Sequence, residues 1–225
     1  MEEISLQQLL EAGCHFGHQS KKWHPAMQPY LFGVRDDIHI FDLVKTKENL
    51  EKAGKFLHQL AKDGKTVLFV GTKRQAVPAI KSTAQATGMP YVSQRWLGGT
   101  LTNWEQIRKN LKNLSDMKTA KTEGQYKKYT KKEQILLDRQ IARLEKFFGG
   151  ITSLDKLPDA LFIVDIKREK TAVREANQLK IPVVAVVDSN CDPGQVDVVI
   201  SANDDGKGSI ELILDYLSRA MKPTK

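Results

Sequence analysis

The chain has 225 residues, 40% of them hydrophobic, a length and composition that suit one ordinary domain or one domain with an insertion. No apolar run approaches the roughly 20 residues of a membrane span, and the acidic N-terminus lacks the basic start and apolar core of a signal peptide. The two cysteines, Cys14 and Cys191, are too few for a disulfide framework, so we expect a cytoplasmic protein with no membrane partner. The formal net charge of +8 favours an anionic binding partner.

The first quarter of the chain predicts a short helix, two strands and a longer helix. Their expected ranges are 5–12, 31–35, 38–41 and 47–62. Ser5 is a suitable N-cap for the first helix, and Gly13 is a suitable stop. Asp36-Asp37 forms the expected turn between the two strands, and Thr46 is the expected cap of the second helix.

An alternation of apolar strands and helices follows. The expected strands are 66–70, 91–93, 160–164, 182–187 and 196–201, and the expected helices are 75–87, 169–180 and 209–221. Continuous apolar runs are typical of strands that are buried on both faces. The alternation therefore predicts a doubly wound parallel α/β sheet in a domain formed by residues 1–103 and 149–225, including an N-terminal arm.

Residues 104–148 have a different pattern and are expected to form an inserted helical hairpin. Apolar residues recur there at helical spacing: Trp104, Ile107, Leu111 and Leu114, then Leu137, Ile141, Leu144 and Phe148. Such spacing makes a narrow apolar seam on each of two helices, as in an antiparallel coiled coil. The polar stretch 119–130 joins the two helices, and Gly149-Gly150 ends the second one.

The positive charge lies in the middle of the sequence. Residues 47–103 and residues 104–147 each carry a net charge of +6, whereas residues 1–46 and 152–225 each carry −2. Clustered cations are what binding to a nucleic acid requires, because neutralised phosphates release their counterions. The alternative is a solvated surface that serves solubility.

The segment 95–104 combines a cation, aromatic rings and bare backbone. Arg95 can form paired hydrogen bonds with a phosphate, and Trp96 and Trp104 offer faces for stacking on bases. The glycine pair 98–99 allows another molecule to approach the main chain. The alternative is a tight connection that packs two tryptophans.

This segment closely resembles the signature of the bacterial small-subunit ribosomal protein S2 family. Further blocks resemble that family in order and spacing, at 15–19, 23–25, 27–30, 33–35, 38–40, 157–165, 175–177, 181–185, 187–193 and 203–205. The resemblance implies a flavodoxin-like sheet with strand order 2-1-3-4-5. It also implies a structural, non-enzymatic protein of the small ribosomal subunit that binds ribosomal RNA, contacts neighbouring ribosomal proteins and helps to anchor ribosomal protein S1 in translation.

Cations and aromatics of the body and hairpin are the predicted RNA contacts. In the body they are Lys21, Lys22, Trp23, His24, Arg35, Lys73, Arg74, Arg95 and Trp96. In the hairpin they are Arg108, Lys109, Lys112, Lys131, Lys132 and Arg139. We expect the cations to bind phosphates, and Trp23 and Trp96 either to stack on splayed bases or to pack beneath the basic residues.

Two groups of side chains suggest a metal ion. Asp188, Asp204 and Asp205 follow predicted strands whose ends converge, so they are a candidate divalent-cation site, although helix caps and turns are the favoured interpretation. The group formed by Cys14, His15, His18 and His24 matches no standard zinc spacing. We expect no resident cofactor.

The alternative function is a doubly wound nucleotide-binding enzyme or regulator. Gly64-Lys65-Thr66 matches the end of a phosphate loop, but it precedes its strand and position 59 is Gln where that loop has its first Gly. Gly71 follows the strand as a single glycine, and no Gly-x-Ser-x-Gly segment provides a nucleophile. We therefore predict that the chain is not an enzyme.

Overall fold

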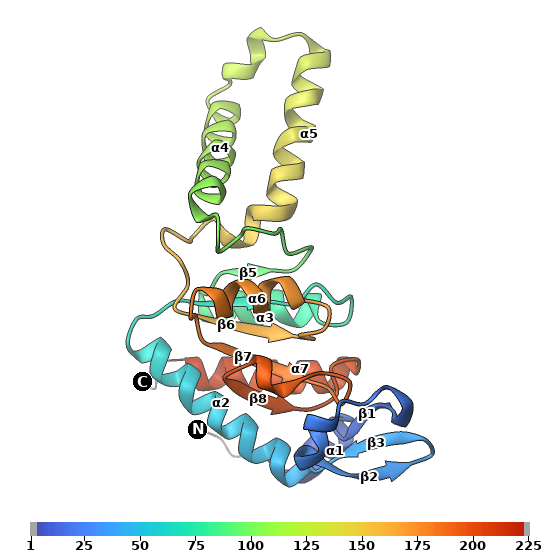
Figure 1. Ribbon diagram of the computed structural model, residues 1–225. Helices are drawn as coiled ribbons and strands as arrows, with labels where there is room; N and C mark the ends of the chain where they lie inside the picture. The colour runs from blue at the N-terminus through green and yellow to red at the C-terminus, as the bar shows by residue number, and fades with distance from the viewer. Residues whose placement is uncertain (1–3, 223–225) are drawn as a thin grey trace.

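The computed structural model describes residues 4–222, and its centre is a five-stranded parallel sheet (Figure 1). The strands are β4 (Val67–Val70), β5 (Tyr91–Val92), β6 (Ala160–Val164), β7 (Val183–Val187) and β8 (Val198–Ser201). Their spatial order is β5-β4-β6-β7-β8. This is the predicted order 2-1-3-4-5, and each continuous apolar run forms a strand near its expected place.

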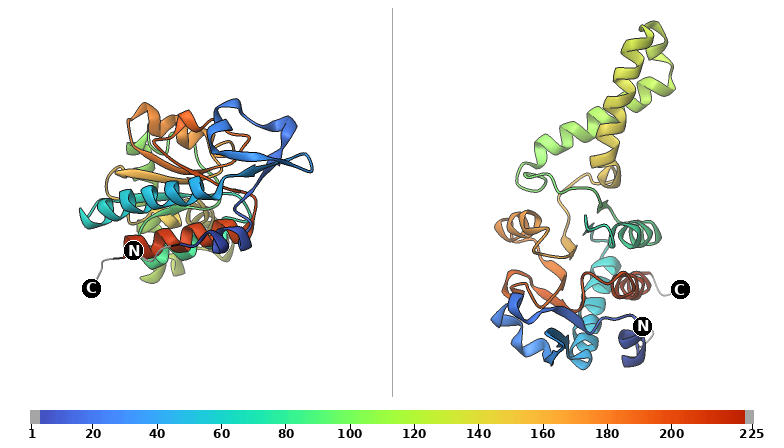
Figure 2. Two further views of the ribbon diagram at one scale, coloured as in Figure 1. Left: turned by 90° about the horizontal axis from the view of Figure 1, so that it is seen from below. Right: turned by 90° about the vertical axis from the view of Figure 1, so that its right-hand side faces the viewer.

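Helices cover both faces of this sheet. Outside the hairpin they are α1 (Leu6–Glu11), α2 (Leu43–Lys62), α3 (Val77–Thr87), α6 (Lys170–Gln178) and α7 (Lys207–Met221). Helices α1, α2, α3 and α7 pack on the face that carries Val67 and Phe69. Helix α6, the loop after β5 and the N-terminal arm pack on the face that carries Leu68 and Val70, as the views from below and from the side show (Figure 2). Alternate side chains of one strand thus enter two separate cores.

The N-terminal arm contains a small antiparallel sheet, only part of which is predicted from the sequence. Its strands are β1 (Phe16–Gln19), β2 (Leu31–Arg35) and β3 (Ile38–Phe41), in the order β1-β3-β2. Asp36 and Asp37 form the predicted turn with φ angles of 51° and 60°, the left-handed conformation that two-residue hairpin loops require. Strand β1 was not predicted. Short 3-10 helices at Ser20–Lys22 and Pro25–Tyr30 connect β1 to β2.

Helix α2 begins earlier than predicted. Asp42 is its N-cap, with a side-chain oxygen that accepts a hydrogen bond from the backbone N–H of Val44 at 3.0 Å. Thr46 lies inside the helix and is fully buried. Its hydroxyl donates to the backbone oxygen of Ser201 at 2.6 Å, so it attaches α2 to the end of β8 and is not a cap. The predicted cap Ser5 is confirmed, since it forms a capping box with Gln8.

The insertion consists of α4 (Trp104–Thr122) and α5 (Lys131–Phe148), which lie side by side and project from the β5 edge of the sheet (Figure 1). Ion pairs cross between them, Lys121 with Asp138 at 2.8 Å and Lys118 with Glu145. The two helices are joined by a 3-10 helix at Gln125–Lys128, and a further one at Gly149–Ile151 follows α5. No helix within residues 4–222 is long and apolar enough to cross a membrane.

The base of the hairpin shares its core with the body. Ile107, Leu111 and Phe148 belong to the same buried cluster as the sheet residues Leu161 and Ile163. The predicted boundary at 104–148 therefore passes through packed side chains, and the division into a body and an inserted hairpin stays a prediction.

Candidate nucleic-acid interface

A single carboxylate organises the segment 95–104. Glu175 of α6 accepts hydrogen bonds on Oε1 from Trp96 Nε1 at 3.1 Å and from the Gly99 backbone N–H at 2.8 Å. Its Oε2 accepts from the backbone N–H groups of Leu101 at 2.9 Å and Thr102 at 3.2 Å, and from the Thr102 hydroxyl at 3.3 Å. Burial opposes ionisation of this carboxyl group, but its donors outweigh burial and lower the pKa of Glu175 below its ordinary value.

This arrangement decides between the two expected roles of Trp96. The side chain is only 7% exposed, and its indole N–H is bound to Glu175. Trp96 is thus part of the core, and the prediction that it stacks on an RNA base is not supported, because the side chain is almost entirely buried. Arg95 precedes it and is exposed, as a phosphate contact requires.

Lys73 is a correction to the predicted contacts. It lies just beyond β4 and is 8% exposed. Its Nζ is 2.6 Å from Asp204 Oδ1, 2.6 Å from Asp205 Oδ1 and 3.2 Å from Asp165 Oδ2. Burial alone would lower the pKa of Lys73, but the surrounding carboxylates raise it, so the ammonium stays charged. Lys73 holds strand ends together and is not available to a phosphate.

The predicted metal residues lie in this cluster, together with His18 of the arm. The ring of His18 bridges two carboxylates, with Nδ1 3.0 Å from Asp188 Oδ1 and Nε2 3.3 Å from Asp205 Oδ2. The hydrogen bond to Asp188 raises the pKa of His18, against the effect of burial. Burial and neighbouring carboxylates likewise raise the pKa of Asp204. The Lys73 ammonium already neutralises charge at Asp204 and Asp205. Binding of a metal ion by Asp188, Asp204 and Asp205 stays a prediction.

Ser189, just after β7, attaches the arm to the body. Its hydroxyl accepts a hydrogen bond from the His18 backbone N–H at 2.8 Å, and its backbone oxygen accepts from the His24 N–H at 2.7 Å. A Cβ at Gly17 would lie 2.8 Å from that hydroxyl, so only glycine allows this approach. The arm residues Lys21 and Lys22 are therefore presented from a fixed position, and both are exposed.

Trp23 and His24 lie in the same part of the arm. The Trp23 ring lies beside the buried His39 ring, with centroids 5.1 Å apart, and it is only partly exposed. His24 caps the following 3-10 helix by accepting from the Ala26 N–H at 3.3 Å. In both positions packing or capping is visible, and a contact with RNA stays a prediction.

The remaining predicted cations are available. Arg35, Arg74 and the hairpin residues Arg108, Lys109, Lys112, Lys131, Lys132 and Arg139 are exposed. Arg35 lies 3.7 Å from Asp36, while the other seven form no ion pair within residues 4–222. A cation without an internal partner keeps its full attraction for a phosphate.

The segment after β4 does not offer the donors of a phosphate loop. Glu169 Oε1 accepts from the Thr72 backbone N–H at 3.0 Å and from the Thr72 hydroxyl at 2.5 Å. A carboxylate therefore already occupies this backbone N–H, where a nucleotide phosphate would bind. This observation weakens the nucleotide-binding alternative.

The organising roles of Glu175, Glu169 and His18 were not anticipated, although His18 and Glu175 lie within blocks that carry the family resemblance.

A model of the family described as Ribosomal protein S2 matches residues 9–224, which is nearly the whole chain.

Proposed function

The chain belongs to the ribosomal protein S2 family and is a structural protein of the small ribosomal subunit, and we propose that it binds small-subunit ribosomal RNA there by charge and shape. The observation that carries the proposal is the set of exposed cations without internal partners on the hairpin. We further propose that the protein acts on cytoplasmic ribosomes and has no catalytic role.

The proposed footprint has two parts, one on the body and one on the hairpin. The body contributes Lys21, Lys22, Arg35, Arg74 and Arg95, and the hairpin contributes Arg108, Lys109, Lys112, Lys131, Lys132 and Arg139. The arm is fixed by Ser189 and the 95–104 loop by Glu175, so ordering on binding is small. Contacts of this kind position a protein on RNA without reading its sequence.

A matched pair of triple variants tests the hairpin contribution. Replacing Arg108, Lys109 and Lys112 by glutamine removes three exposed charges from α4, and the control replaces Lys52, Lys55 and Lys62 of α2. Filter binding to small-subunit ribosomal RNA over a range of salt gives the affinity and its salt dependence. We expect the fall of log affinity with log salt to become less steep in the α4 variant, by roughly one unit of slope for each phosphate that is no longer neutralised. The control should change little. Equal losses of affinity in the two variants would contradict the proposed footprint.

We also propose a protein contact at the β2–β3 hairpin, where ribosomal protein S1 is the partner that the family resemblance implies. Phe32 of β2 is 82% exposed, and the neighbouring Val34 is 55% exposed. Exposed apolar side chains grouped in this way are typical of protein contacts. We expect Phe32→Ser to weaken capture of purified S1, whereas the control Leu136→Ser, at a residue 54% exposed on α5, leaves it unchanged. Unchanged capture by the Phe32 variant would exclude this surface.

The candidate cation site is tested by linkage. If Asp188, Asp204 and Asp205 hold a divalent cation, a chelator lowers the melting temperature of the protein, and adding the metal restores it. An unchanged melting curve assigns the three aspartates to the Lys73 and His18 network alone.

A further inference from the structure

A cleft with a volume of about 550 Å³ lies between the N-terminal part of α6, the arm and the connection from β7 to β8. His24 of the arm lines it, as do Lys167, which precedes α6, and Lys170 and Arg174 of α6. His24 is among the RNA contacts predicted from the sequence, whereas these three cations are not. The volume is in the range of small-molecule sites, roughly 300 to 1,000 Å³.

Three cations of the cleft have no ion-pair partner in the described chain, although carboxylates of Asp165 and Asp204 lie within 4.8 Å of the Cys191 thiol that lines it. Lys167, Lys170 and Arg174 are exposed and form no ion pair with any residue in the range 4–222. Asp192 is the one acidic residue of the lining, and its carboxylate already accepts from Gly194 N at 3.0 Å and from Gln195 Nε2 at 3.4 Å. Three cations beside one engaged carboxylate attract an anionic ligand.

The lining also suits a nucleobase. Ile166, Val173 and Cys191 contribute buried apolar side chains, at 2%, 1% and 4% exposure. Asn190 lies at the same cleft, and its Oδ1 accepts from the Cys191 thiol at 2.9 Å, which leaves its amide nitrogen for a ligand. The three apolar side chains are too buried to stack on a base, so the base contact of this lining is a hydrogen bond from the Asn190 amide nitrogen to a base edge.

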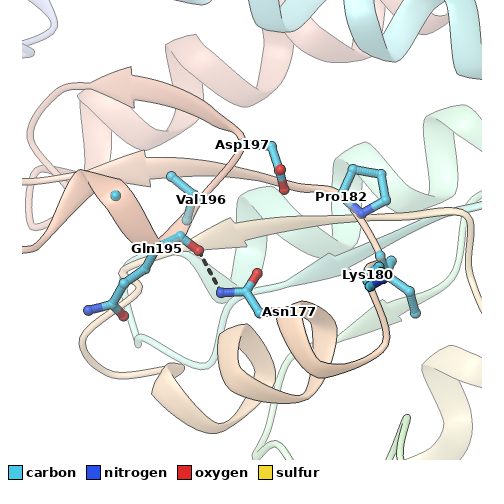
Figure 3. Close-up of a pocket in the computed structure, with 8 residues that line it drawn as sticks. Asn177, Lys180, Pro182, Gln195, Val196 and Asp197 are labelled. Atoms are coloured by element: carbon cyan, nitrogen blue, oxygen red, sulfur yellow. Dashed lines mark hydrogen bonds between the residues drawn. The ribbon is translucent and has the colours of Figure 1, made fainter.

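The cleft is formed before any ligand binds. Asn177 Nδ2 donates to the Gln195 backbone oxygen at 2.9 Å, a bond that joins α6 to the β7–β8 connection. Figure 3 shows this bond among the residues that line a neighbouring cavity of about 390 Å³. That cavity shares Asn177 and Gln195 with the cleft and is also lined by Lys180 and Pro182. A ligand therefore meets a fixed wall, so little binding energy is lost to ordering.

We propose that this cleft binds one nucleotide of a single-stranded segment of ribosomal RNA, with its phosphate at Lys170 and Arg174 and its base edge at the Asn190 amide nitrogen. The inference rests on the proposed RNA-binding function and adds a site on the body that is separate from the hairpin. Charge favours RNA over a peptide, since every nucleotide of RNA carries a phosphate charge, whereas a peptide is anionic only where it has acidic side chains. A free nucleotide has the same chemistry as the RNA segment, and the experiment distinguishes them.

The test compares two double variants of the full chain. One replaces Lys170 and Arg174 by glutamine, and the control replaces Lys52 and Lys55 of α2, which are also exposed cations without ion pairs in the described chain. Melting curves check that both fold. Filter binding to small-subunit ribosomal RNA gives the salt slope, and backbone footprinting gives the protected nucleotides. A parallel thermal-shift titration uses adenosine and uridine monophosphate.

We expect the α6 variant to lower the salt slope by about one to two, and to lose protection of one short single-stranded segment while the hairpin-dependent protections persist. The control variant should change neither the slope nor the footprint. An unchanged slope and footprint in the α6 variant would overturn the cleft proposal while RNA binding by the hairpin stands. Stabilisation of the wild type by a monophosphate that disappears in the α6 variant, together with an unchanged RNA footprint in that variant, would overturn it in favour of a free-nucleotide site. Absence of RNA binding by the wild type would remove the proposed function itself.

Discussion

Replacing Glu175 by glutamine is expected to loosen the 95–104 loop and to lower the free energy of unfolding. The carboxylate accepts from five donors, and four of them are N–H groups that cannot accept in return, so the new amide nitrogen must point its own donors at other donors. If the amide oxygen keeps Trp96 and Gly99, the backbone N–H groups of Leu101 and Thr102 lose their acceptor. The Leu101 donor is buried and the Thr102 donor is partly buried, and together their loss of a partner costs roughly 2 to 4 kcal/mol.

For a chain of this length each kcal/mol corresponds to about 2 to 4 °C in melting temperature, so we expect a drop of roughly 4 to 16 °C. The control is Glu211→Gln on α7, where the carboxylate is exposed and only forms a surface ion pair with Lys207 at 3.6 Å. Thermal and urea unfolding of both variants measure the difference. If Glu175→Gln melts within the scatter of the control, the carboxylate does not hold the loop and this reasoning is wrong.

The pH dependence gives a second readout for the same residue. The folded-state pKa of Glu175 is lowered, so its contribution is present above the pKa of the unfolded chain and is lost as pH falls through the folded value. The stability difference between wild type and Glu175→Gln should therefore shrink in acid. A difference that stays constant from neutral pH into acid would mean that ionisation of this group is not what the loop depends on.

Two further substitutions test the packing and the charge network. Gly150→Ala should lower the free energy of unfolding by roughly 3 kcal/mol, because the new Cβ would overlap the Tyr91 backbone oxygen. The control is Gly98→Ala, whose Cβ meets nothing within 4 Å. Urea unfolding compares the two variants, and equal stabilities would show that the backbone at Gly150 moves aside without cost. Lys73→Met should destabilise by roughly 3 to 5 kcal/mol, and more at about pH 8 than at about pH 5, because the raised pKa of Asp204 lets that carboxyl group take up a proton in acid. A loss of stability that is the same at both pH values would show that Asp204 is not the group left unpaired.

The sheet was predictable because its information is local. Continuous apolar runs such as 160–164 identify strands buried on both faces, and their alternation with helices leaves few topologies. The hairpin followed from its apolar spacing, and the cap of α1 from Ser5. Strand β1 was missed because Phe16–Gln19 is short and shows no alternation, and its pairing with β3 is what stabilises it as a strand.

The candidate site was less predictable because its partners are distant in the sequence. Lys73 follows a strand like a phosphate-binding residue, but Asp204, 131 positions away, fixes its role. Trp96 is bound by Glu175, 79 positions away. Charge and residue type indicate which side chains can bind RNA, but burial decides which of them are free to do so.

The salt dependence of binding to small-subunit ribosomal RNA tests the central claim most directly. If about six exposed cations bind phosphates, log affinity falls linearly with log salt, and the affinity drops roughly a thousandfold between about 50 and 200 mM salt. Filter binding with the full chain measures this. An affinity that stays flat over that range would contradict the account of this protein as one that binds RNA by charge and shape.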